Sequence, residues 1–495
     1  MKKITAIFIT LALIMGLCAC SQSASTAWQE QYDLGVRYLS EGNYREAIIA
    51  FQAAIEIDPR HAEAYEKLAD AYLALGDLDS ALQALRDGYA ATGNPRLQAR
   101  IDELTAPEAT PPPEPTQEPT PEVGNITWSL IDGTLTISGT GPMDDYEYRN
   151  SPWYEDRDSI TMIVIEDGVT SIGGYAFESC SNLTSVTIPD SVISIGVEAF
   201  GSCSSLTSVT IPDSVTSIGG LAFEFCTSLT SVTIPNSVTS IEIGAFFECN
   251  NLTNVTIPNS VTSIGSRAFS DCSSLTSIEV ESGNPAYISV DGVLFSADRT
   301  YLHTYPAGKS NSFYSIPVSV TSIGACAFHS CSRLTSVTIP NSVVSIGENA
   351  FLGSSLTSVT IPSSVASIGA WAFGMCFSLT SISVASGNHA YISVDGILFN
   401  ADKTYLHTYP AGKSGSSYSI PSFVTSIGDH AFDACIGLIS VTIPNSVTSI
   451  GSWVFYSCSS LTDVYYGGSE AQWNQVAIDE LCNEPLLNAT IHYNS

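Results

Sequence analysis

The chain has 495 residues, of which only 13% are charged, and its formal net charge at pH 7 is −32. A chain of this length exceeds one compact core, so several domains or a repeat array are expected. The acidic excess repels nucleic acid and anionic lipid, which argues against functions that require binding to phosphate groups. It does not indicate which partner the protein binds.

The N-terminus has the pattern of a secretory signal. Two lysines precede an apolar run over residues 4–17, which is too short for a membrane span. The run ends in Leu-Cys-Ala-Cys-Ser (17–21), which resembles the lipobox of bacterial lipoproteins; the small alanine before the cut favours Cys20 over Cys18 as the lipidated residue. We therefore expect residues 1–19 to be a lipoprotein signal peptide and the rest to be extracytoplasmic. An ordinary signal peptide with incidental cysteines is the alternative.

Residues 27–104 have a helical period and repeat every 34 residues. One unit carries Leu34, Gly35, Tyr38, Ala47, Phe51, Ala54 and Pro59, and the next carries Tyr65, Leu68, Ala69, Tyr72, Ala81 and Leu85. The pattern resembles a tetratricopeptide repeat pair, with a capping helix over residues 95–104. The resemblance implies a peptide- or protein-binding module, and a pedestal without a ligand is an equal alternative. Residues 105–123 are rich in Pro, Glu and Thr and predict an extended linker.

From residue 160 onward a pattern of 23 residues dominates: Leu-Thr-Ser-Val-Thr-Ile-Pro-Asp/Asn-Ser-Val-x-Ser-Ile-Gly-x-x-Ala-Phe-x-x-Cys-x-x. Its leading apolar residue falls at Ile160, Leu183, Leu206, Leu229, Leu252, Leu275, Leu334, Leu356, Leu379, Leu438 and Leu461. The Leu-x-x-Val-x-Ile part predicts a short strand, the Val-x-Ser-Ile part a second extended piece, and Ala-Phe a short helical turn. Each unit leaves apolar flanks that only stacking on its neighbours buries, so the pattern predicts a parallel-β solenoid.

This pattern resembles the BspA-type bacterial surface leucine-rich repeats over residues 124–495. The resemblance includes both ends, so we expect an N-terminal cap over residues 124–159, a solenoid over 160–466 and a C-terminal cap over 467–495. The predicted fold class is α+β and multidomain: a leucine-rich-repeat parallel-β solenoid preceded by a small all-α tetratricopeptide repeat domain. The resemblance implies an adhesion or interaction role at the cell surface, with host or bacterial surface proteins or glycans as partners and the lipid anchor as the only membrane contact.

Two units of 59 residues, beginning at Leu275 and Leu379, carry insertions near residues 281–312 and 385–416, here called the islands. Residues 288–310 match residues 392–414 at 20 of 23 positions, and the Asp-Gly pair in each copy predicts a hairpin. Aromatic residues beside charge are typical of protein-binding surfaces. The candidate ligand-binding residues are Tyr301, His303, Tyr305, Lys309, Tyr405, His407, Tyr409 and Lys413. A second interpretation is that every other residue of the island strands, including Leu302 and Leu406, serves only to pack the strands.

Two regular units depart from the pattern. Glu242 replaces the glycine that follows Ser-Ile, and the unit beginning at Leu334 is one residue short, with Gly353 in the cysteine position. We expect each departure to distort one coil without breaking the stack.

Nine cysteines share one column, each three residues before a leading Leu: Cys180, Cys203, Cys226, Cys249, Cys272, Cys331, Cys376, Cys435 and Cys458. Stacked coils give parallel Cβ vectors and no clustered ligands, so we expect free, buried thiols and no metal. Two Gly-Lys-Ser runs lack the earlier glycine of a phosphate loop, and no nucleophile or calcium motif occurs. The sequence predicts a binding protein that is not an enzyme and needs no cofactor. A structural surface-coat protein without a specific ligand is the main alternative.

Overall fold

The computed structural model describes residues 126–479 and 482–494 and, nearer the N-terminus, residues 32, 35, 44–57, 60–74, 78–92, 97, 100 and 101. The predicted lipidation site Cys20 and the linker lie outside these residues. The chain divides into two compact units, Met1–Glu118 and Pro119–Ser495. Within the described ranges, no helix combines the length and the apolar character needed to cross a bilayer.

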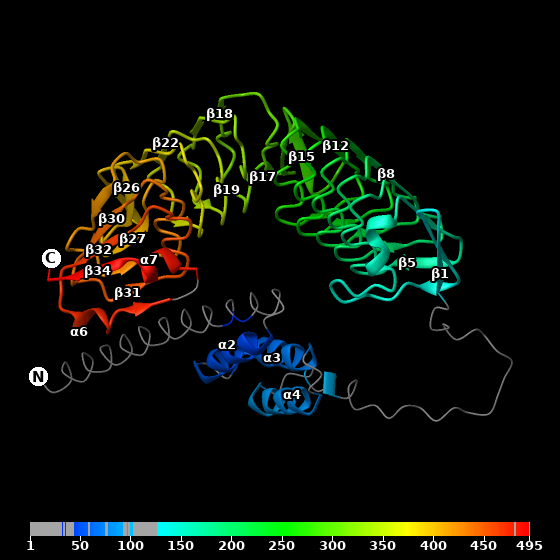
Figure 1. Cartoon of the computed structure of the whole chain (residues 1–495), viewed down its shortest axis with the longest axis horizontal. Helices are drawn as coiled ribbons and strands as arrows, with labels where there is room; N and C mark the ends of the chain where they lie inside the picture. Colours follow the sequence, from blue (N-terminus) through cyan, green and yellow to red (C-terminus); the bar gives the residue numbers. More distant parts are fainter. Residues whose placement is uncertain are drawn as a thin grey trace, which may run out of the picture. The chain divides into compact units, whose positions relative to one another are not determined.

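The first unit is a small helical domain, as predicted (Figure 1). Helix α3 (Ala62–Ala74) packs against both α2 (Tyr44–Ile57) and α4 (Leu78–Thr92). A Cβ atom on Gly88 would lie 2.6 Å from the Cβ of Tyr65, so glycine allows α4 to approach α3 closely. Leu97 and Ile101, from the stretch expected to cap the domain, are buried in the same core.

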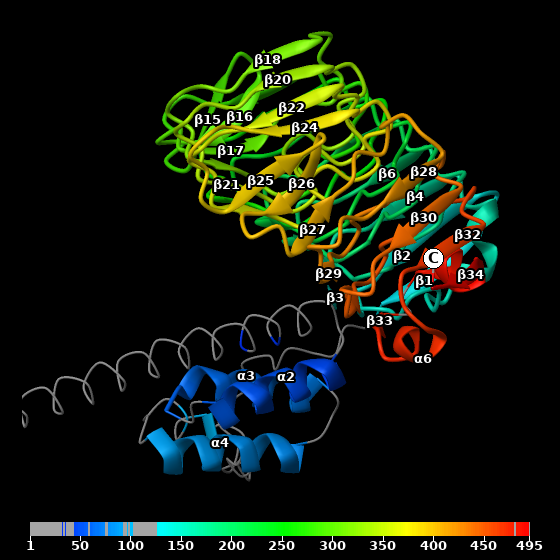
Figure 2. The same ribbon diagram turned by 90° about the vertical axis from the view of Figure 1, so that its left-hand side faces the viewer.

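In the second unit, the Ser-Val-Thr part of each coil forms a first ladder of parallel strands. Paired strands are in register one coil apart, so that Val209 lies opposite Val232, and the hydrogen bonds join the strands of this ladder into separate sheets of two or four strands. The middle residue of each strand faces the core and its neighbours face solvent. In chain order the strands are β4 (Met162–Ile165), β6 (Ser185–Thr187), β8 (Ser208–Thr210), β10 (Ser231–Thr233), β12 (Asn254–Ile257), β14 (Ser277–Val280), β18 (Phe313–Ser315), β20 (Ser336–Thr338), β22 (Ser358–Ile361), β24 (Ser381–Val384), β28 (Ser417–Ser419), β30 (Ser440–Ile443) and β32 (Asp463–Tyr466). Figure 2 shows β18, β20, β22 and β24 side by side.

The Ser-Ile part of each coil forms a second ladder on the other side of the core. Ile195 pairs with Ile172 of the coil before and Ile218 of the coil after. The turn between the two ladders is closed by a proline, whose carbonyl accepts from the N–H of the inward-facing Val three residues later. The strands are β5 (Val169–Ile172), β7 (Ser194–Ile195), β9 (Ser217–Ile218), β11 (Ser240–Ile241), β13 (Ser263–Ile264), β19 (Ser322–Ile323), β21 (Ser345–Ile346), β23 (Ser367–Ile368), β29 (Ser426–Ile427) and β31 (Ser449–Ile450).

The Ala-Phe part of each coil closes the loop with tight turns and not with the predicted helical turn. The residue before Ala and the residue before Cys have positive φ, for example Glu198 at 50° and Ser202 at 60°. This left-handed geometry turns the amides along the solenoid axis, where they bond the next coil: Phe200 N donates to Ala222 O at 2.8 Å. These bonds between coils occur beside bonds within the turns, such as Gly201 N to Glu198 O at 3.0 Å, so the segment is a pair of tight turns joined to the next coil.

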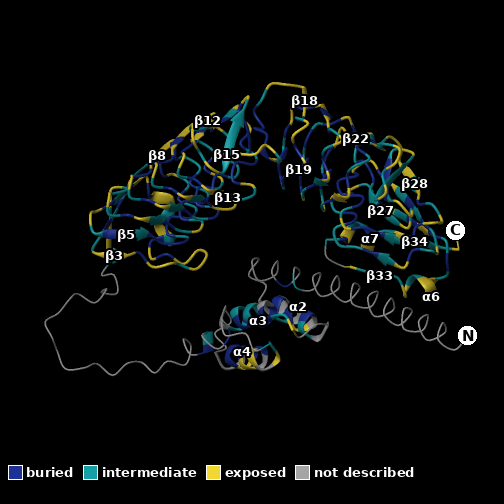
Figure 3. Ribbon diagram, turned by 180° about the vertical axis from the view of Figure 1, so that it is seen from behind, coloured by how far each residue is buried: buried dark blue, intermediate teal, exposed yellow. Residues whose placement is uncertain are grey.

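Phenylalanine rings form the centre of the core. Phe177, Phe200, Phe223 and Phe246 are fully buried and stack with centroid separations of 5.3–5.4 Å. At the N-terminal end Trp153 stacks on Phe177 at 5.6 Å. Burial along the whole unit is shown in Figure 3. Each coil thus contributes one ring to a continuous aromatic stack in the core.

Extra strands extend both ladders at the two ends. At the start, β1 (Thr127–Ile131) pairs antiparallel with β2 (Thr134–Ser138), β2 pairs with β4, and β3 (Gly141–Pro142) pairs with β5. The 3-10 helix η1 (Tyr154–Ser159) then leads into the first coil. At the end, β33 (Ala477–Ile478) pairs with β31 and β34 (Thr490–Tyr493) pairs with β32, accompanied by the short helices α6 (Glu470–Trp473) and α7 (Glu484–Asn488).

Each island inserts the predicted hairpin. In the first, β15 (Tyr287–Val290) pairs antiparallel with β16 (Val293–Ser296), and the turn residues Asp291 and Gly292 both have positive φ. Strand β17 (Tyr301–Thr304) follows and pairs in parallel with β19. The second island repeats this arrangement with β25 (Tyr391–Val394), β26 (Ile397–Asn400) and β27 (Tyr405–Thr408).

The islands divide the core into three clusters, over residues 135–294, 293–398 and 397–486, which we call the N-terminal, middle and C-terminal segments. Strand β16 is the partition between the first two. Leu294 belongs to the N-terminal core, whereas Val293 and Phe295 belong to the middle core. Alternating strand side chains therefore join two cores through one strand.

The two irregular units keep the stack intact, as expected. Glu242 N donates to Ile218 O at 3.0 Å, like Gly219 N to Ile195 O at 2.9 Å in a regular coil. The short unit keeps its second ladder, because Ile346 still pairs with Ile368.

Candidate binding surfaces

Tyr305 and Tyr409, both predicted to contact a ligand, lie in the core. Tyr305 is 2% exposed and stacks on Phe328 at 5.1 Å; Tyr409 is 4% exposed and stacks on Phe432 at 5.0 Å. Each takes the place of a coil phenylalanine and begins a new stack after an island. Their burial is inconsistent with direct ligand contact, and burial raises the pKa of the Tyr305 hydroxyl to about 12.

His303 is also a structural residue. The strand β13 ends at an island, so the N–H and C=O of Ile264 have no following strand to bond. The N–H donates to the hydroxyl of Tyr287 at 2.8 Å, and the C=O accepts from Nε2 of His303 at 3.0 Å. Because a carbonyl only accepts, Nε2 carries the proton and Nδ1 accepts from the Thr304 hydroxyl at 2.8 Å. Both ring nitrogens are occupied, and burial lowers the pKa of His303.

The second island reproduces these contacts. Ile368 N donates to the Tyr391 hydroxyl at 2.9 Å, and Ile368 O lies 3.4 Å from Nε2 of His407. Burial likewise lowers the pKa of His407. His303, Tyr305, His407 and Tyr409 therefore follow the second interpretation, in which island residues pack the strands. Leu302 and Leu406 are fully buried as well.

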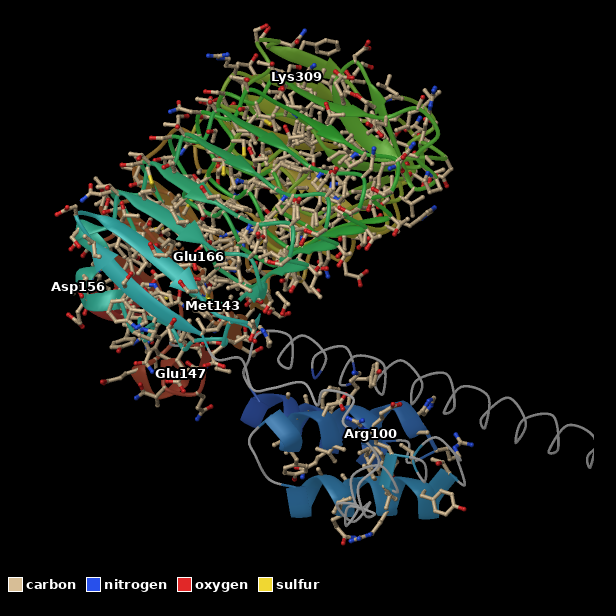
Figure 4. The ribbon with its side chains drawn as sticks, turned by 90° about the vertical axis from the view of Figure 1, so that its right-hand side faces the viewer. Arg100, Met143, Glu147, Asp156, Glu166 and Lys309 are labelled. Carbon is tan, nitrogen blue, oxygen red and sulfur yellow. The ribbon has the colours of Figure 1, made fainter. Side chains whose placement is uncertain are left out.

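The lysines brace the hairpins. Lys309 Nζ donates to the Asp291 carbonyl at 2.6 Å, and Lys413 Nζ donates to the Asp395 carbonyl at 2.6 Å. Both remain half-buried at the surface. Figure 4 labels Lys309 on the first island, far along the second unit from Met143 in its first coils.

Tyr301 and Tyr405 are the predicted residues whose rings border open space. Tyr301 is 37% exposed. Its hydroxyl oxygen lies over Gly324, 2.6 Å from the position that a Cβ atom on this glycine would take. Tyr405 lies across Gly428 in the same way. A groove of about 410 Å³ adjoins Tyr405, with a floor of small residues from the second ladder, Ser426, Gly428, Ser449 and Gly451. Its volume lies within the range of about 300–1,000 Å³ that is typical of ligand sites.

A similar groove of about 600 Å³ lies over the second ladder in the N-terminal segment. It is lined by Met143, Tyr146 and Tyr175 above Gly174 and Gly196. In both grooves the floor consists of small residues of the second ladder, and larger residues stand beside them.

The threonines that directly precede the first-ladder strands are already bonded to the backbone. Thr184 Oγ donates to Thr161 O at 2.9 Å, and Thr230 Oγ to Thr207 O at 3.2 Å, each one coil back. Hydroxyls already bonded to the backbone of the preceding coil contribute little selective recognition.

Sequence reasoning missed the surface where the coils differ most. We call it the Ala-Phe corner: the residue before Ala and the two residues after Phe in each coil. Across the first island Asp271 forms an ion pair with His329, Oδ2 to Nδ1 at 3.1 Å. Across the second island Trp371 and His430 rings lie 3.9 Å apart, and Asp433 Oδ2 accepts from Met375 N at 3.1 Å.

These corner contacts have an identifiable cause. The island chain bypasses the corner, so side chains join the coils on either side. Burial raises the pKa of Asp433 to about 6, opposed by the Met375 N–H and the Trp371 indole, and burial lowers the pKa of His430 to about 4. The sequence could have indicated these positions, because their residue types do not repeat from one coil to the next.

The nine column cysteines are free and buried, as predicted. Each regular thiol donates to a Phe carbonyl one coil back, for example Cys226 Sγ to Phe200 O at 3.3 Å. Burial raises the pKa of the Cys226 thiol to about 12, so it is not a reactive thiolate. Among the residues that the structure describes, no His, Cys, Asp and Glu side chains gather in a group able to hold a metal ion.

Comparison with known proteins is consistent with both units. A family model described as a BspA type leucine rich repeat region matches residues 150–276, 307–399 and 409–479 in six copies, and a tetratricopeptide repeat model matches residues 32–95. A search of curated proteins gives no significant match.

Solved structures resemble the second unit. A leucine-rich repeat protein from Eubacterium ventriosum is 30% identical, with 68% of this chain and 87% of that chain covered and a TM-score of 0.53. A leucine rich cell surface protein from Faecalibacterium prausnitzii is 30% identical, with 74% and 99% covered and a TM-score of 0.43.

Proposed function

Because this chain belongs to the BspA type leucine-rich repeat family, we propose that it is a lipid-anchored cell-surface protein that binds host or bacterial surface proteins or glycans through its solenoid. The observation that carries this proposal is the duplicated island, which presents Tyr301 and Tyr405 over the second ladder at equivalent positions. Tyrosine combines apolar area with a hydroxyl and is enriched at binding hot spots.

The groove beside Tyr405 provides the recognition geometry. Its small Ser and Gly side chains leave the backbone of the second ladder close to the surface, and Tyr405 closes one side. Two equivalent tyrosines 104 residues apart along one solenoid suit a ligand that repeats, because the second contact is then intramolecular.

The test compares single and double variants of the mature chain. Intact bacteria and immobilised extracellular-matrix proteins serve as probes. Tyr301→Ala with Tyr405→Ala should weaken capture far more than either change alone. The matched control replaces two exposed first-ladder residues, Thr210→Ala with Thr233→Ala, and should bind normally. Normal capture by the double tyrosine variant with an unaltered thermal transition contradicts the proposal and favours a structural surface coat.

Surface attachment rests on Cys20. Acyl chains on this residue would hold the mature protein on the membrane without the need for a spanning helix, and none is found among the described residues. Cys20→Ala should leave unprocessed precursor or release soluble protein, measured by fractionation and by mass of the mature N-terminus. Normal membrane retention of an unlipidated variant would contradict the anchor.

A further inference from the structure

A small pocket lies beside the hairpin of the first island. It has a volume of about 110 Å³ and is lined by Val290, Phe295, Arg299, Pro317 and Ser319. The first two residues belong to the strands β15 and β16, and the last two to the turn that follows β18. A pocket of this size suits a single ring, since a closed cavity of about 150 Å³ holds benzene.

The second island has the same frame around this position. The two hairpins share one strand register, and the two turns are closed by the same hydrogen bond to a proline carbonyl, at 3.0 Å. The equivalent residues, 104 positions later, are Val394, Phe399, Lys403, Pro421 and Phe423. Three positions are identical and one exchanges arginine for lysine. The change from Ser319 to Phe423 is the one that alters the size of the side chain.

Phe423 shows what the frame accommodates. Its ring stands edge-on to Phe399 with centroids 5.9 Å apart, and Lys403 Nζ lies 5.8 Å from its centroid. These two contacts are the counterparts of the pocket residues Phe295 and Arg299. The ring of Phe423 therefore lies where the first island has its pocket. The ring is 39% exposed, so the frame is open to solvent on one side.

Arg299 gives an independent indication that a ring belongs in the pocket. Of the five arginines in the second unit, Arg149, Arg157 and Arg267 lie over rings of their own chain, 4.2–5.4 Å from the centroids. Arg333 donates to a backbone carbonyl. Arg299 is exposed, and its guanidinium has no ion pair, hydrogen bond or ring contact with any residue that the structure describes. Its positive charge complements the negative face of an aromatic ring.

The dimensions of the pocket favour a side chain over a free ligand. Sites that bury most of a small molecule have volumes of about 300–1,000 Å³, well above that of this pocket. A pocket for one ring with apolar surface beside it is typical of the anchor points of protein interfaces. Val318, between two lining residues in the sequence, is 83% exposed, and its counterpart at the second island is Ser422. The first island thus combines an open ring site with an apolar rim.

We propose that this pocket binds an aromatic side chain of a partner protein. The ring packs against Phe295 with Arg299 over its face, as the ring of Phe423 packs against its two neighbours. The inference rests on the proposed binding role of the solenoid and adds an anchor site to it. None of the eight residues predicted from the sequence to contact a ligand lines the pocket.

The probe is a short Gly/Ser peptide with one central para-fluorophenylalanine between two valines. Its binding to the full mature chain is followed by fluorine NMR. A competing peptide carries cyclohexylalanine at the central position, which keeps the six-carbon ring and removes the aromatic face. Benzyl alcohol, as a second competitor, represents a small aromatic compound.

Two reciprocal variants test the comparison of the islands. Ser319→Phe introduces the residue that fills the frame of the second island, and Phe423→Ser opens that frame. Because the second island already contains phenylalanine in the same frame, Ser319→Phe should fold normally. The matched control is Asn236→Phe, which adds a ring at an exposed position in the proline turn of a regular coil.

The unaltered chain should bind one peptide, and Ser319→Phe should weaken this binding at least about tenfold. The control should bind within about twofold of the unaltered chain. Phe423→Ser should gain a second site, weaker than the first because Ser422 replaces the apolar rim residue. Arg299→Gln, and the exchange of the aromatic ring for cyclohexane, should each weaken binding by about two- to fivefold.

Three results would overturn the proposal. The first is undiminished binding by Ser319→Phe, or an equal loss in the Asn236→Phe control. The second is the absence of an additional site in Phe423→Ser, which would contradict the equivalence of the two frames. The third is displacement of the peptide by benzyl alcohol at equal concentration, which would assign the pocket to a small aromatic compound.

These outcomes are separable from those of the proposed function. Peptide binding should be unchanged in the variant Tyr301→Ala with Tyr405→Ala, because neither tyrosine lines the pocket. Normal capture by that variant contradicts recognition through the island tyrosines and leaves the pocket standing. Undiminished peptide binding by Ser319→Phe removes the pocket and leaves the tyrosine sites standing.

Discussion

A regular coil and an island use different groups to satisfy the hydrogen bonds of an exposed backbone edge. In a regular coil, the second-ladder edge is met by a similar coil on each side: Ile195 pairs with Ile172 and Ile218, and Cys226 bonds a carbonyl one coil back. At an island the repeating partner is absent. Tyrosine and histidine side chains then bond the open edge at Ile264 and Ile368.

The difference shows which residues are free to evolve a ligand contact. Island residues that replace a missing coil, such as His303 and Tyr305, are as constrained as core residues. Residues left at the margin, such as Tyr301, keep more than a third of their surface exposed, although the Tyr301 hydroxyl also bonds the backbone of Ala325. In repeat proteins, a break in the repeat is therefore first a structural element, and only its margins are available for recognition.

The largest change in the free energy of unfolding is expected from substitutions of the island tyrosines. Tyr305→Ala removes a buried ring from the base of an aromatic stack and should lower the free energy of unfolding by about 3–5 kcal/mol. Tyr301→Ala, at a partly exposed ring, should cost about 1–2 kcal/mol or less. Urea titration of the full chain measures both. Equal costs would contradict the division of the island into core and margin.

A second test concerns the glycine column of the regular coils. A Cβ on Gly219 would lie 2.6–2.8 Å from backbone atoms of Gly196 and Ile195, which cannot rotate away. Gly219→Val should therefore destabilise the N-terminal segment by about 2–3 kcal/mol. The control is Gly437→Ala, where no atom lies within 4 Å of the added Cβ, and it should leave the unfolding midpoint unchanged.

The pH dependence should have opposite signs in the two regions. Burial lowers the pKa values of His303 and His407, so the native islands bind fewer protons than the unfolded chain, and they lose stability as pH falls below about 6.5. Glu224, with a pKa of about 7 against an ordinary 4.5, binds more protons in the native state, so its coil gains stability as pH falls from 7 toward 4.5. Glu224 is half exposed and screened, so we expect a change of the order of 1 kcal/mol there.

Hydrogen exchange at pH 7.5 and 5.5, corrected for intrinsic rates, resolves the two regions. Protection should fall in β13 and β17 and rise in the coil of Glu224. His303→Gln with His407→Gln should abolish the acid sensitivity of the islands. A uniform change along the solenoid would refute the assignment of opposite signs.

The smallest effect is expected at the cysteines. Ten of the eleven thiols from Cys180 to Cys482 are buried, and Cys482 is half-buried. Native titration should detect Cys482 alone, and denaturation without reductant should reveal all eleven. Formation of even one disulfide in the oxidised protein would contradict the parallel orientation of stacked thiols.

Sequence reasoning worked where the chain repeats and failed where it does not. The strand residues Val209 and Ile218 and the cysteine column follow from a period of 23, because equal residues stacked on equal residues have one consistent solution. The helical turn was predicted wrongly because the left-handed conformation is held by bonds to the neighbouring coil and leaves no mark in the local sequence. Tyr305 was predicted as a ligand contact because nothing in the linear sequence aligned it with the phenylalanines.

The sequence by itself therefore determined the solenoid, the small helical domain, the hairpins of the islands and the free thiols, since each follows from local propensity or from period. Only the tertiary structure decided which side chains remain available. Whether Tyr301 or Tyr305 borders solvent depends on which one enters the ring stack, and the pairing of Asp271 with His329 depends on the path of the island between them. Both are set by contacts between coils at least 20 residues apart in sequence, and such contacts exist only once the stack has formed.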